Sequence, residues 1–346
     1  MMAFLFLSGF VLSLFLFSVG RKIALRAGFV DRPGVLKTHE GGVPPIGGLV
    51  ILPVFAALSW LGGFQDIVPL SLLLGLFAVL VMGALDDAFI LPAWVRFVLQ
   101  FAVSVFIVVV GGVQLHTMGN LLGFGEIYPG WFSVPFTIMC FMVLMNALNM
   151  MDGLDGLSGG YCAGVVFLLI LACGRAGLWN YVVVLSFLLA PLLAFLVFNM
   201  RHPWRRKASI FIGDSGALAL ALLLGWFCIT LSQSAVTGQP AALAPVSIIW
   251  LLAVPVMDLF ALFFVRLRRR QHPFEGDRDH LHHRILDRGI SPEKATPLIL
   301  VVAAFLGLVG LAGFWMRLPE AALFGLWVFI LLAYTFRGLK KYGRKN

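Results

Sequence analysis

The sequence predicts an all-α protein, a polytopic bundle of about eleven transmembrane helices that forms one integral-membrane domain over residues 1–346. Hydrophobic residues make up 61% of the chain and charged residues only 12%, whereas a soluble domain carries about 25% charge. The apolar residues occur in runs of about 20, the length that crosses roughly 30 Å of hydrocarbon. A soluble globular protein is therefore excluded.

Apolar runs between charged or glycine- and proline-containing segments are the candidate spans. The first run has no Lys or Arg before it and is followed by Arg21 and Lys22, the reverse of a cleavable signal peptide. We therefore expect an uncleaved helix with its N-terminus outside, and an odd number of spans then places the C-terminus in the cytoplasm. The candidate spans lie near residues 2–20, 46–64, 67–85, 93–111, 132–150, 159–174, 179–199, 213–231, 242–265, 297–314 and 320–337.

The basic residues support this topology because they collect on the side predicted to be cytoplasmic. Of the 25 Lys and Arg residues, only Arg175 and Arg317 fall outside. The positive-inside rule explains the net charge of +9, so the charge indicates a lipid bilayer as partner and does not indicate nucleic acid. The other basic residues lie in 21–45, at 96, in 201–207, in 266–296 and from 337 onward.

Acidic residues gather on the same side, where predicted helices meet cytoplasmic segments. Asp86 and Asp87 end the third span, and the repulsion between two adjacent carboxylates at an apolar boundary would be relieved by a divalent cation. Asp214 opens the eighth span, where it either caps the helix or binds a ligand. Asp258 lies inside the ninth span, roughly 10 Å from the helix end at about 1.5 Å per residue. It is either functional or satisfied by an interhelical hydrogen bond.

The end of the fifth span combines polar residues with glycines. Its polar side chains recur every three residues, and the glycines between them argue against one unbroken helix. We expect a glycine-rich loop whose backbone N–H groups contact phosphate, while carboxamides and carboxylates hold a metal or ribose. Residues 213–216, Gly-Asp-Ser-Gly, form a second such turn. The polar residues at the end of the fifth span and in the glycine-rich loop after it are Asn146, Asn149, Asp152, Asp155 and Ser158.

Two further cytoplasmic segments carry candidate ligands. The last loop holds a His-x-His-His-Arg motif with no cysteine nearby, so we expect it to bind phosphate or sugar hydroxyls and not zinc. The first loop holds a Lys and a His before a glycine–proline run, which is either part of the site or only a tight turn into the second span. The residues of these segments are His280, His282, His283 and Arg284, and Lys37 and His39.

Together these features indicate a basic, Asp-rich and glycine-rich site where a helical bundle meets the cytoplasm. Phosphoryl transfer needs such a set. A metal neutralises the diphosphate, cations stabilise the charge on the equatorial oxygens, and the site holds the attacking and leaving oxygens in line. The interface position suits one lipid substrate and one water-soluble substrate. Composition and spacing therefore predict Mg²⁺-dependent transfer that involves a diphosphate and a lipid, without naming a sugar.

Four of these motifs occur in the order found in the polyprenyl-phosphate N-acetylhexosamine-1-phosphate transferases, and the first cytoplasmic loop also resembles theirs, so the resemblance runs from about Val30 to about Arg288. The four motifs are Asp86-Asp87, residues 146–155, residues 213–216 and residues 280–284. The resemblance implies attack by an oxygen of undecaprenyl phosphate on the β-phosphorus of a UDP-N-acetylhexosamine, with release of UMP. It also implies Mg²⁺ or alternatively Mn²⁺ as the metal, and inhibition by tunicamycin-type mimics of the UDP-sugar. The expected location is a bacterial inner membrane with the active site on its cytoplasmic face. A homodimer is one candidate assembly.

The resemblance also implies roles for single residues. Asp214 is the first candidate for a metal ligand, with Asn149 near the metal or the diphosphate. The expected catalytic residues are Asp86, Asp87, Asp152, Asp155 and His283. The expected substrate-binding residues are Lys37, Asn146, Asn149, His280, His282 and Arg284.

The His-x-His-His motif is similar to the branch that uses UDP-N-acetylglucosamine, and not to the muramyl-pentapeptide branch with its run of three histidines. The expected reaction is then the first membrane step of O-antigen or related surface-glycan synthesis. Ala217 stands where many relatives have Ser, which leaves another UDP-N-acetylhexosamine, such as a 6-deoxy sugar, as an alternative. From another class, a secondary transporter would show internal repeats and charges near the midplane. A membrane prenyltransferase would not need the histidine loop.

Overall fold

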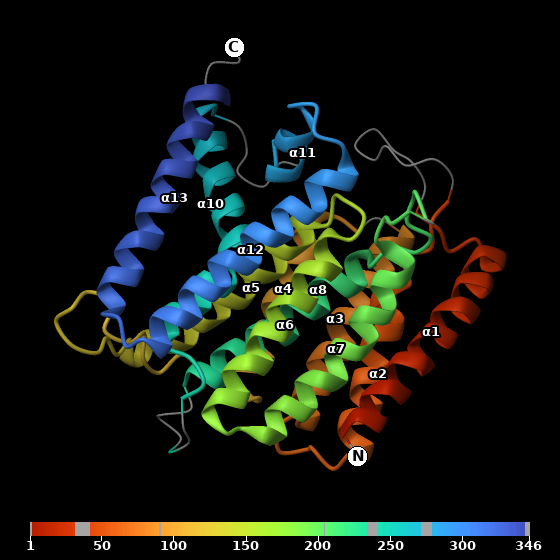
Figure 1. Cartoon of the computed structure of the whole chain (residues 1–346), viewed down its shortest axis with the longest axis horizontal. Coiled ribbons are helices and arrows are strands. Elements are labelled where there is room, and N and C mark those ends of the chain that lie inside the picture. The colour runs from red at the N-terminus through yellow and green to blue at the C-terminus, as the bar shows by residue number, and fades with distance from the viewer. Residues whose placement is uncertain are drawn as a thin grey trace.

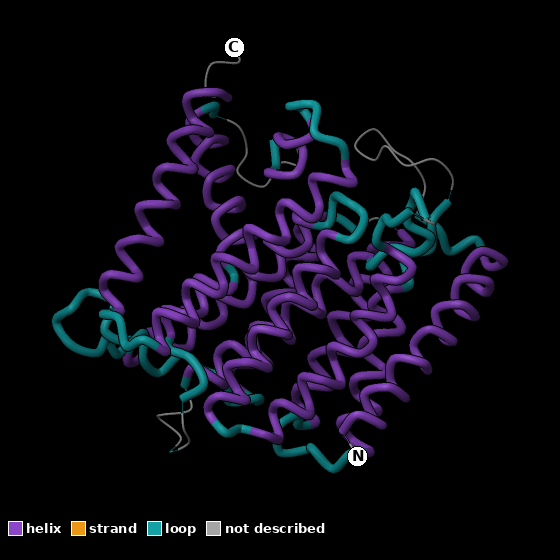
Figure 2. The backbone as a smooth tube through the Cα atoms, in the orientation of Figure 1, coloured by secondary structure: helices purple, strands orange, loops and turns teal. Residues whose placement is uncertain are grey.

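The computed structural model describes residues 2–31, 42–89, 91–203, 205–233, 238, 241–270 and 279–342. All regular structure in these ranges is helical (Figure 2). The described residues also form two isolated β-bridges, one between Asp31 and Val43 and one between His202 and Arg205. The helices are α1 (Met2–Ala27), α2 (Gly47–Leu61), α3 (Leu70–Phe89), α4 (Ala93–Val109), the 3-10 turn η1 (Gly130–Phe132), α5 (Ser133–Met151), α6 (Leu157–Ala176), α7 (Trp179–Asn199), α8 (Gly213–Ser232), α9 (Pro245–Leu251), α10 (Ala253–Arg268), α11 (Leu281–Leu286), α12 (Pro292–Trp315) and α13 (Glu320–Tyr342).

The predicted class, an all-α polytopic membrane protein, is confirmed. Eight helices in the described ranges are long and apolar enough to cross a membrane, and α9 with α10 forms a ninth span if the bent pair crosses as one. Two apolar helices, α2 with 15 residues and α4 with 17, are shorter. The number of spans and the orientation of the termini stay predictions.

The ninth predicted span, 242–265, is not one straight helix, because α9 and α10 meet at an angle of 77°. Pro255 explains the break, since proline has no N–H to donate to the carbonyl four residues earlier and its ring crowds that carbonyl. That carbonyl belongs to Leu251, and it accepts instead a 2.7 Å hydrogen bond from the hydroxyl of Tyr161 on α6. The carbonyl that the proline leaves free is therefore satisfied by a neighbouring helix.

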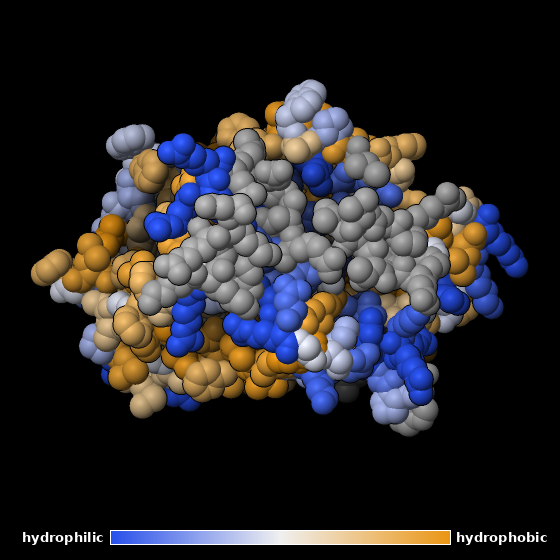
Figure 3. Space-filling model, turned by 90° about the horizontal axis from the view of Figure 1, so that it is seen from above, coloured by the Kyte–Doolittle hydropathy of each residue, from blue (hydrophilic) through white to orange (hydrophobic). Residues whose placement is uncertain are grey.

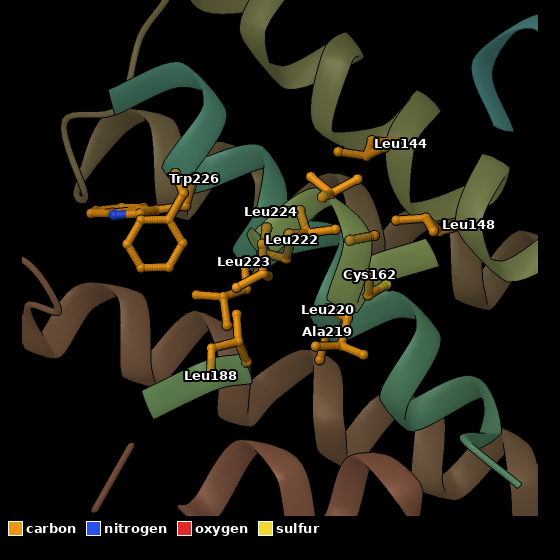
Figure 4. Packing of buried hydrophobic residues seen from close by; sticks show 14 of the residues in the cluster. Leu144, Leu148, Cys162, Leu188, Ala219, Leu220, Leu222, Leu223, Leu224 and Trp226 are labelled. Carbon is orange, nitrogen blue, oxygen red and sulfur yellow. The ribbon is translucent and has the colours of Figure 1, made fainter. Parts of the chain in front are cut away.

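Helix α8 is the centre of the bundle. After Asp214 it contains no charged residue, and 94% of its most apolar 18-residue stretch is buried, as expected for a helix that is apolar on every face. It packs against α2, α3 and α5, with leucines from several helices around it (Figure 4). A Cβ on Gly48 would lie 2.3 Å from the Cα of Gly216, so the starts of α2 and α8 touch backbone to backbone.

The two ends of the bundle differ. The start of α1 and the end of α13 lie at opposite ends, and α11, the loop after α5 and the loop before α8 lie at the same end as the end of α13 (Figure 1). Hydrophilic side chains gather on this end and hydrophobic ones lie around its rim (Figure 3). We call it the polar end. At the opposite end, Asn120 N donates to Glu320 at 2.8 Å, and Arg175 stacks on Trp315 at 5.4 Å.

Candidate active site

Asp86 and Asp87, adjacent in the sequence, have different partners. Asp86 is buried, with 5% of its surface exposed, and it accepts hydrogen bonds from Leu91 N at 2.7 Å and from the Arg96 guanidinium at 3.0 Å. Arg96 thus supplies a positive charge beside one of the two carboxylates. The contacts of Asp86 join α3 to the start of α4, and its predicted catalytic role stays a prediction.

Asp87 faces the start of α8. Its two carboxylate oxygens accept the backbone N–H of Asp214 at 2.9 Å and of Ser215 at 3.3 Å. These N–H groups have no partner inside the helix, and the positive end of the helix dipole favours a carboxylate there. Asp87 and Asp214, 127 residues apart in sequence, are therefore brought to the same place.

Glycines make this approach feasible. A Cβ on Gly83 would lie 2.3 Å from the Cα of Ser215, so α3 and α8 are in backbone contact beside the carboxylates. Gly213 has a φ of +74°, and a Cβ there would meet Asp87 Oδ2 at 2.6 Å and the carbonyl of Pro45 at 2.9 Å. Only glycine satisfies both the backbone conformation and the space at this turn.

The predicted break after the fifth span is confirmed. Helix α5 ends at Met151 and α6 begins at Leu157, with Gly156 at a φ of +80° before it. Asp152, at the end of α5, is exposed, and Asn149 is half-buried in the last turn. Asn146 lies deeper, where its amide donates to Gln100 on α4 at 2.7 Å and to the Met142 carbonyl at 2.8 Å.

Asp155 connects three segments at the polar end. Its Oδ2 accepts from Arg201 Nε at 2.7 Å and from Ala208 N at 3.1 Å, while its carbonyl accepts from Thr296 at 3.1 Å. Arg201 also binds Glu293 at 2.7 Å. Burial alone would lower the pKa of Arg201, but the hydrogen bonds to Glu293 and Asp155 raise it. The guanidinium thus holds the glycine-rich turn against the loop before α8 and the start of α12.

The histidine motif lies against the same glycine-rich turn. A Cβ on Gly153 would lie only 2.0 Å from Nε2 of His282, so the imidazole occupies the space that glycine leaves open. The ring of His282 is parallel to that of His280, with 5.9 Å between centroids, and 4.2 Å from the ring of His283. Burial, together with charge on the two neighbouring histidines, lowers the pKa of His282 to about 3. His282 is therefore a neutral imidazole at physiological pH.

His280 and Arg284 are tied to the helices beneath them. His280 Nδ1 lies 3.0 Å from Oδ2 of Asp258 on α10, and Tyr334 on α13 donates to Oδ1 at 2.7 Å, so an interhelical hydrogen bond does satisfy Asp258. Arg284 donates from Nε to the Asp279 carbonyl at 2.6 Å and stacks on Tyr334 of α13 at 5.5 Å. A small cavity between α5, α10 and α11 is lined by Met150, Asp258, His280 and His282, among others.

The structure thus brings Asp87 to the start of α8 and His282 to the glycine-rich turn, while Asp86 and Asn146 are bound to partners on α4. Lys37, with His39, lies outside the described residues. Within the described ranges no group of three or more His, Cys, Asp or Glu side chains could hold a metal by itself. The sequence motifs do not include the partners that the structure gives these residues, which are Arg96, Gln100, Arg201, Glu293 and Tyr334. For Arg96, Arg201 and Glu293 the sequence shows a charged residue but not its partner, and nothing in the sequence pairs Tyr334 with Asp258.

Fold and site together define a polytopic membrane enzyme with carboxylates, backbone N–H groups and histidines at one end of its bundle. The family described as glycosyl transferase family 4 matches residues 69–232, from the segment before α3 to the end of α8. The relatives below are similar over nearly the whole chain. The chain belongs to this family of undecaprenyl-phosphate sugar-1-phosphate transferases.

Three relatives carry the same name, undecaprenyl-phosphate alpha-N-acetylglucosaminyl 1-phosphate transferase. The protein of Salmonella typhi is 31% identical over 342 residues, which cover 95% of this chain and 89% of the relative. The protein of Yersinia pestis is 32% identical over 336 residues, with 94% and 88% covered. The protein of Escherichia coli strain K12 is 31% identical over 342 residues, with 95% and 89% covered.

Proposed function

We propose that this protein transfers N-acetylglucosamine 1-phosphate from UDP-N-acetylglucosamine to undecaprenyl phosphate and releases UMP. The observation that carries the proposal is the likeness to transferases of that name over 95% of the chain. The geometry supports it, because the motif residues converge on the polar end of the bundle, where a water-soluble nucleotide sugar and a lipid head group can meet.

In the proposed reaction an oxygen of the lipid phosphate attacks the β-phosphorus, and UMP leaves from the opposite side. The contact between Asp87 and the start of α8 is the proposed centre of this step. The positive end of the α8 dipole favours an anionic phosphate nearby. Asp87 positions the lipid phosphate or accepts its proton on a carboxylate oxygen, while the two N–H groups of α8 keep that carboxylate in place.

The donor chemistry at this centre fits Mg²⁺. The Asp87 carboxylate accepts the backbone N–H of Asp214, so two Asp residues meet at this contact, and Mg²⁺ takes one or two carboxylates and completes its shell with phosphate oxygens and water. Asp214, with Asn149 on the adjacent α5, would hold the ion, and Mn²⁺ would be held by the same oxygen atoms. When bound, the ion would neutralise charge on the diphosphate.

The nucleotide and sugar are proposed to lie across the glycine-rich turn after α5. Asp152 is exposed there, and His282 of α11 lies against Gly153. His282, being neutral, offers one ring N–H as a donor and one nitrogen as an acceptor, which suits a sugar hydroxyl or amide better than a phosphate charge. His280 and His283 are proposed to face the diphosphate.

We further propose that the polar end faces the cytoplasm of a bacterial cell, across its inner membrane. The asymmetry of Lys and Arg supports this orientation, and the relatives are bacterial. The product would begin O-antigen or a related surface glycan. We also propose a homodimer as one candidate assembly, and a detergent-corrected mass of twice 37.9 kDa would support it.

The experiment that tests the proposed function is UMP release by purified protein in detergent, with undecaprenyl phosphate and Mg²⁺, across a panel of UDP-N-acetylhexosamines. We expect release from UDP-N-acetylglucosamine that stops without lipid, with EDTA, or with saturating tunicamycin. Release only from another donor, such as a 6-deoxy sugar, would correct the sugar. No release from any donor by folded protein would overturn the proposal and return attention to a transporter.

A further inference from the structure

Asp258 is a buried carboxylate, 8% exposed, whose oxygens are both occupied. Oδ2 lies 3.0 Å from His280 Nδ1, and Oδ1 accepts from the hydroxyl of Tyr334 at 2.7 Å. The backbone N–H of Leu281 lies 3.1 Å and 3.2 Å from the two oxygens. The carboxylate therefore receives donors from the histidine segment on one side and from α13 on the other.

Tyr334 comes from the last helix of the chain, 76 residues from Asp258 in sequence. Leu332 and Phe336, its neighbours two residues away on α13, are 62% and 58% exposed, so they lie on the outer face of the helix. The tyrosine is turned inward, with its ring under the Arg284 guanidinium at 5.5 Å. The hydroxyl, the one polar group of this side chain, donates to Asp258.

These contacts determine the tautomer and the orientation of the His280 ring. Because Asp258 acts as an acceptor in this cluster, Nδ1 of His280 carries the hydrogen, and Nε2 is the nitrogen left for a ligand. The ring is also parallel to that of His282, which lies over Gly153 in the glycine-rich turn. A carboxylate that holds and orients an imidazole in this way is a common device behind functional histidines.

We propose that Tyr334 and Asp258 are positioning residues for His280, so that the last helix, α13, sets the tautomer and direction of a histidine at the active site. The inference rests on the proposed function, because it concerns that site. Without the hydroxyl, Oδ1 of Asp258 keeps, among the residues that the structure describes, only the shared N–H of Leu281, and the carboxylate can rotate away from Nδ1.

The test is Tyr334→Phe, which removes the hydroxyl and leaves the ring beneath Arg284. Its matched control is Tyr161→Phe, which removes another hydroxyl with a 2.7 Å bond, but one made to the backbone carbonyl of Leu251. We expect kcat for UMP release to fall about 10-fold in Tyr334→Phe, with KM for the nucleotide sugar nearly unchanged. Tyr161→Phe should keep the wild-type kcat and lose only thermal stability.

A second readout does not depend on turnover. In protein labelled with ¹⁵N-histidine, and with the signal assigned through His280→Gln, the ring shifts of His280 should show a hydrogen on Nδ1 in the wild type. They should move toward mixed tautomers in Tyr334→Phe and in Asp258→Asn, but not in Tyr161→Phe. Unchanged ring shifts in folded Tyr334→Phe, or a kcat equal to that of Tyr161→Phe, would overturn the inference. A wild type that releases no UMP overturns the proposed function instead, and the ring shifts still decide the inference.

Discussion

At the scale of single residues, Asp86 and Asp87 show how neighbouring identical side chains acquire different roles. Asp86 is buried and paired with Arg96, whereas Asp87 is half-buried and faces the first N–H groups of α8. Their repulsion is therefore relieved by separate partners, and not only by a shared cation, as the sequence alone suggested. This separation leads to different expectations for the two variants.

Asp87→Asn should lower kcat for UMP release by at least about 100-fold, because the carboxamide offers no charge to a cation and cannot take a proton. The protein should remain folded and inserted in the membrane, because the carboxamide oxygen can still accept one of the two N–H groups of α8. Asp86→Asn should mainly destabilise the fold, by about 1 kcal/mol, through its weakened bond to Arg96. Steady-state assays and thermal melts measure both. Wild-type turnover by Asp87→Asn would remove this carboxylate from the catalytic set.

His282 links protonation to stability. Its pKa is about 3 in the folded protein, against about 6.5 in an unfolded chain. As the pH falls below 6.5, the unfolded chain binds a proton at this histidine and the folded protein does not. The contribution of His282 to the free energy of unfolding is therefore fully present above pH 6.5 and is lost as the pH falls toward 3, by up to about 1.4 kcal/mol per pH unit. We expect the melting temperature of the wild type to fall more steeply from pH 6.5 to 4.5 than that of His282→Gln. Parallel curves would contradict the buried, neutral histidine.

At the scale of elements, backbone contact between helices determines the site. Helices α3 and α8 touch where Gly83 meets Ser215, one turn before Asp87. Membrane helices commonly use small residues to approach this closely. Here the approach also places the carboxylate of one helix on the N–H groups of the other.

Gly83→Ala should push α3 away from α8, since its Cβ would meet backbone atoms that cannot rotate aside. We expect loss of most turnover together with a lower melting temperature, by an amount typical of overpacking, about 1–3 kcal/mol. Gly164→Ala on α6 is the control, because no atom lies within 4 Å of its Cβ position and alanine favours a helix. Equal activity in the two variants would show that this helix contact does not position the site.

Element boundaries could be predicted only in part. The break after α5 followed from the glycines, but the 77° bend at α9 and α10 was missed, although Pro255 was visible. An apolar run with one proline reads as a single span, and the carbonyl that Pro255 leaves free is bound by Tyr161, 90 residues away from Leu251. Long-range pairs of this kind, including Arg201 with Asp155, leave no periodic trace in the sequence.

At the scale of the whole molecule, the bilayer makes the fold predictable. Helices must satisfy their own backbone groups in hydrocarbon, so apolar length alone identifies most spans, and charge asymmetry then predicts sides. The candidate site was predictable as a set of motifs at one end, because each motif marks a helix end. Which residue contacts which could not be predicted, because those contacts depend on packing.

The measurement that tests the central claim most directly follows the β-phosphorus itself. Purified protein is given UDP-N-acetylglucosamine labelled with ³²P at the β-phosphate, together with undecaprenyl phosphate and Mg²⁺. Sugar-1-phosphate transfer predicts that the label moves into the lipid fraction while unlabelled UMP is released in equal amount. Label retained in released UDP, with sugar appearing on the lipid, would show transfer of the sugar alone and contradict the account.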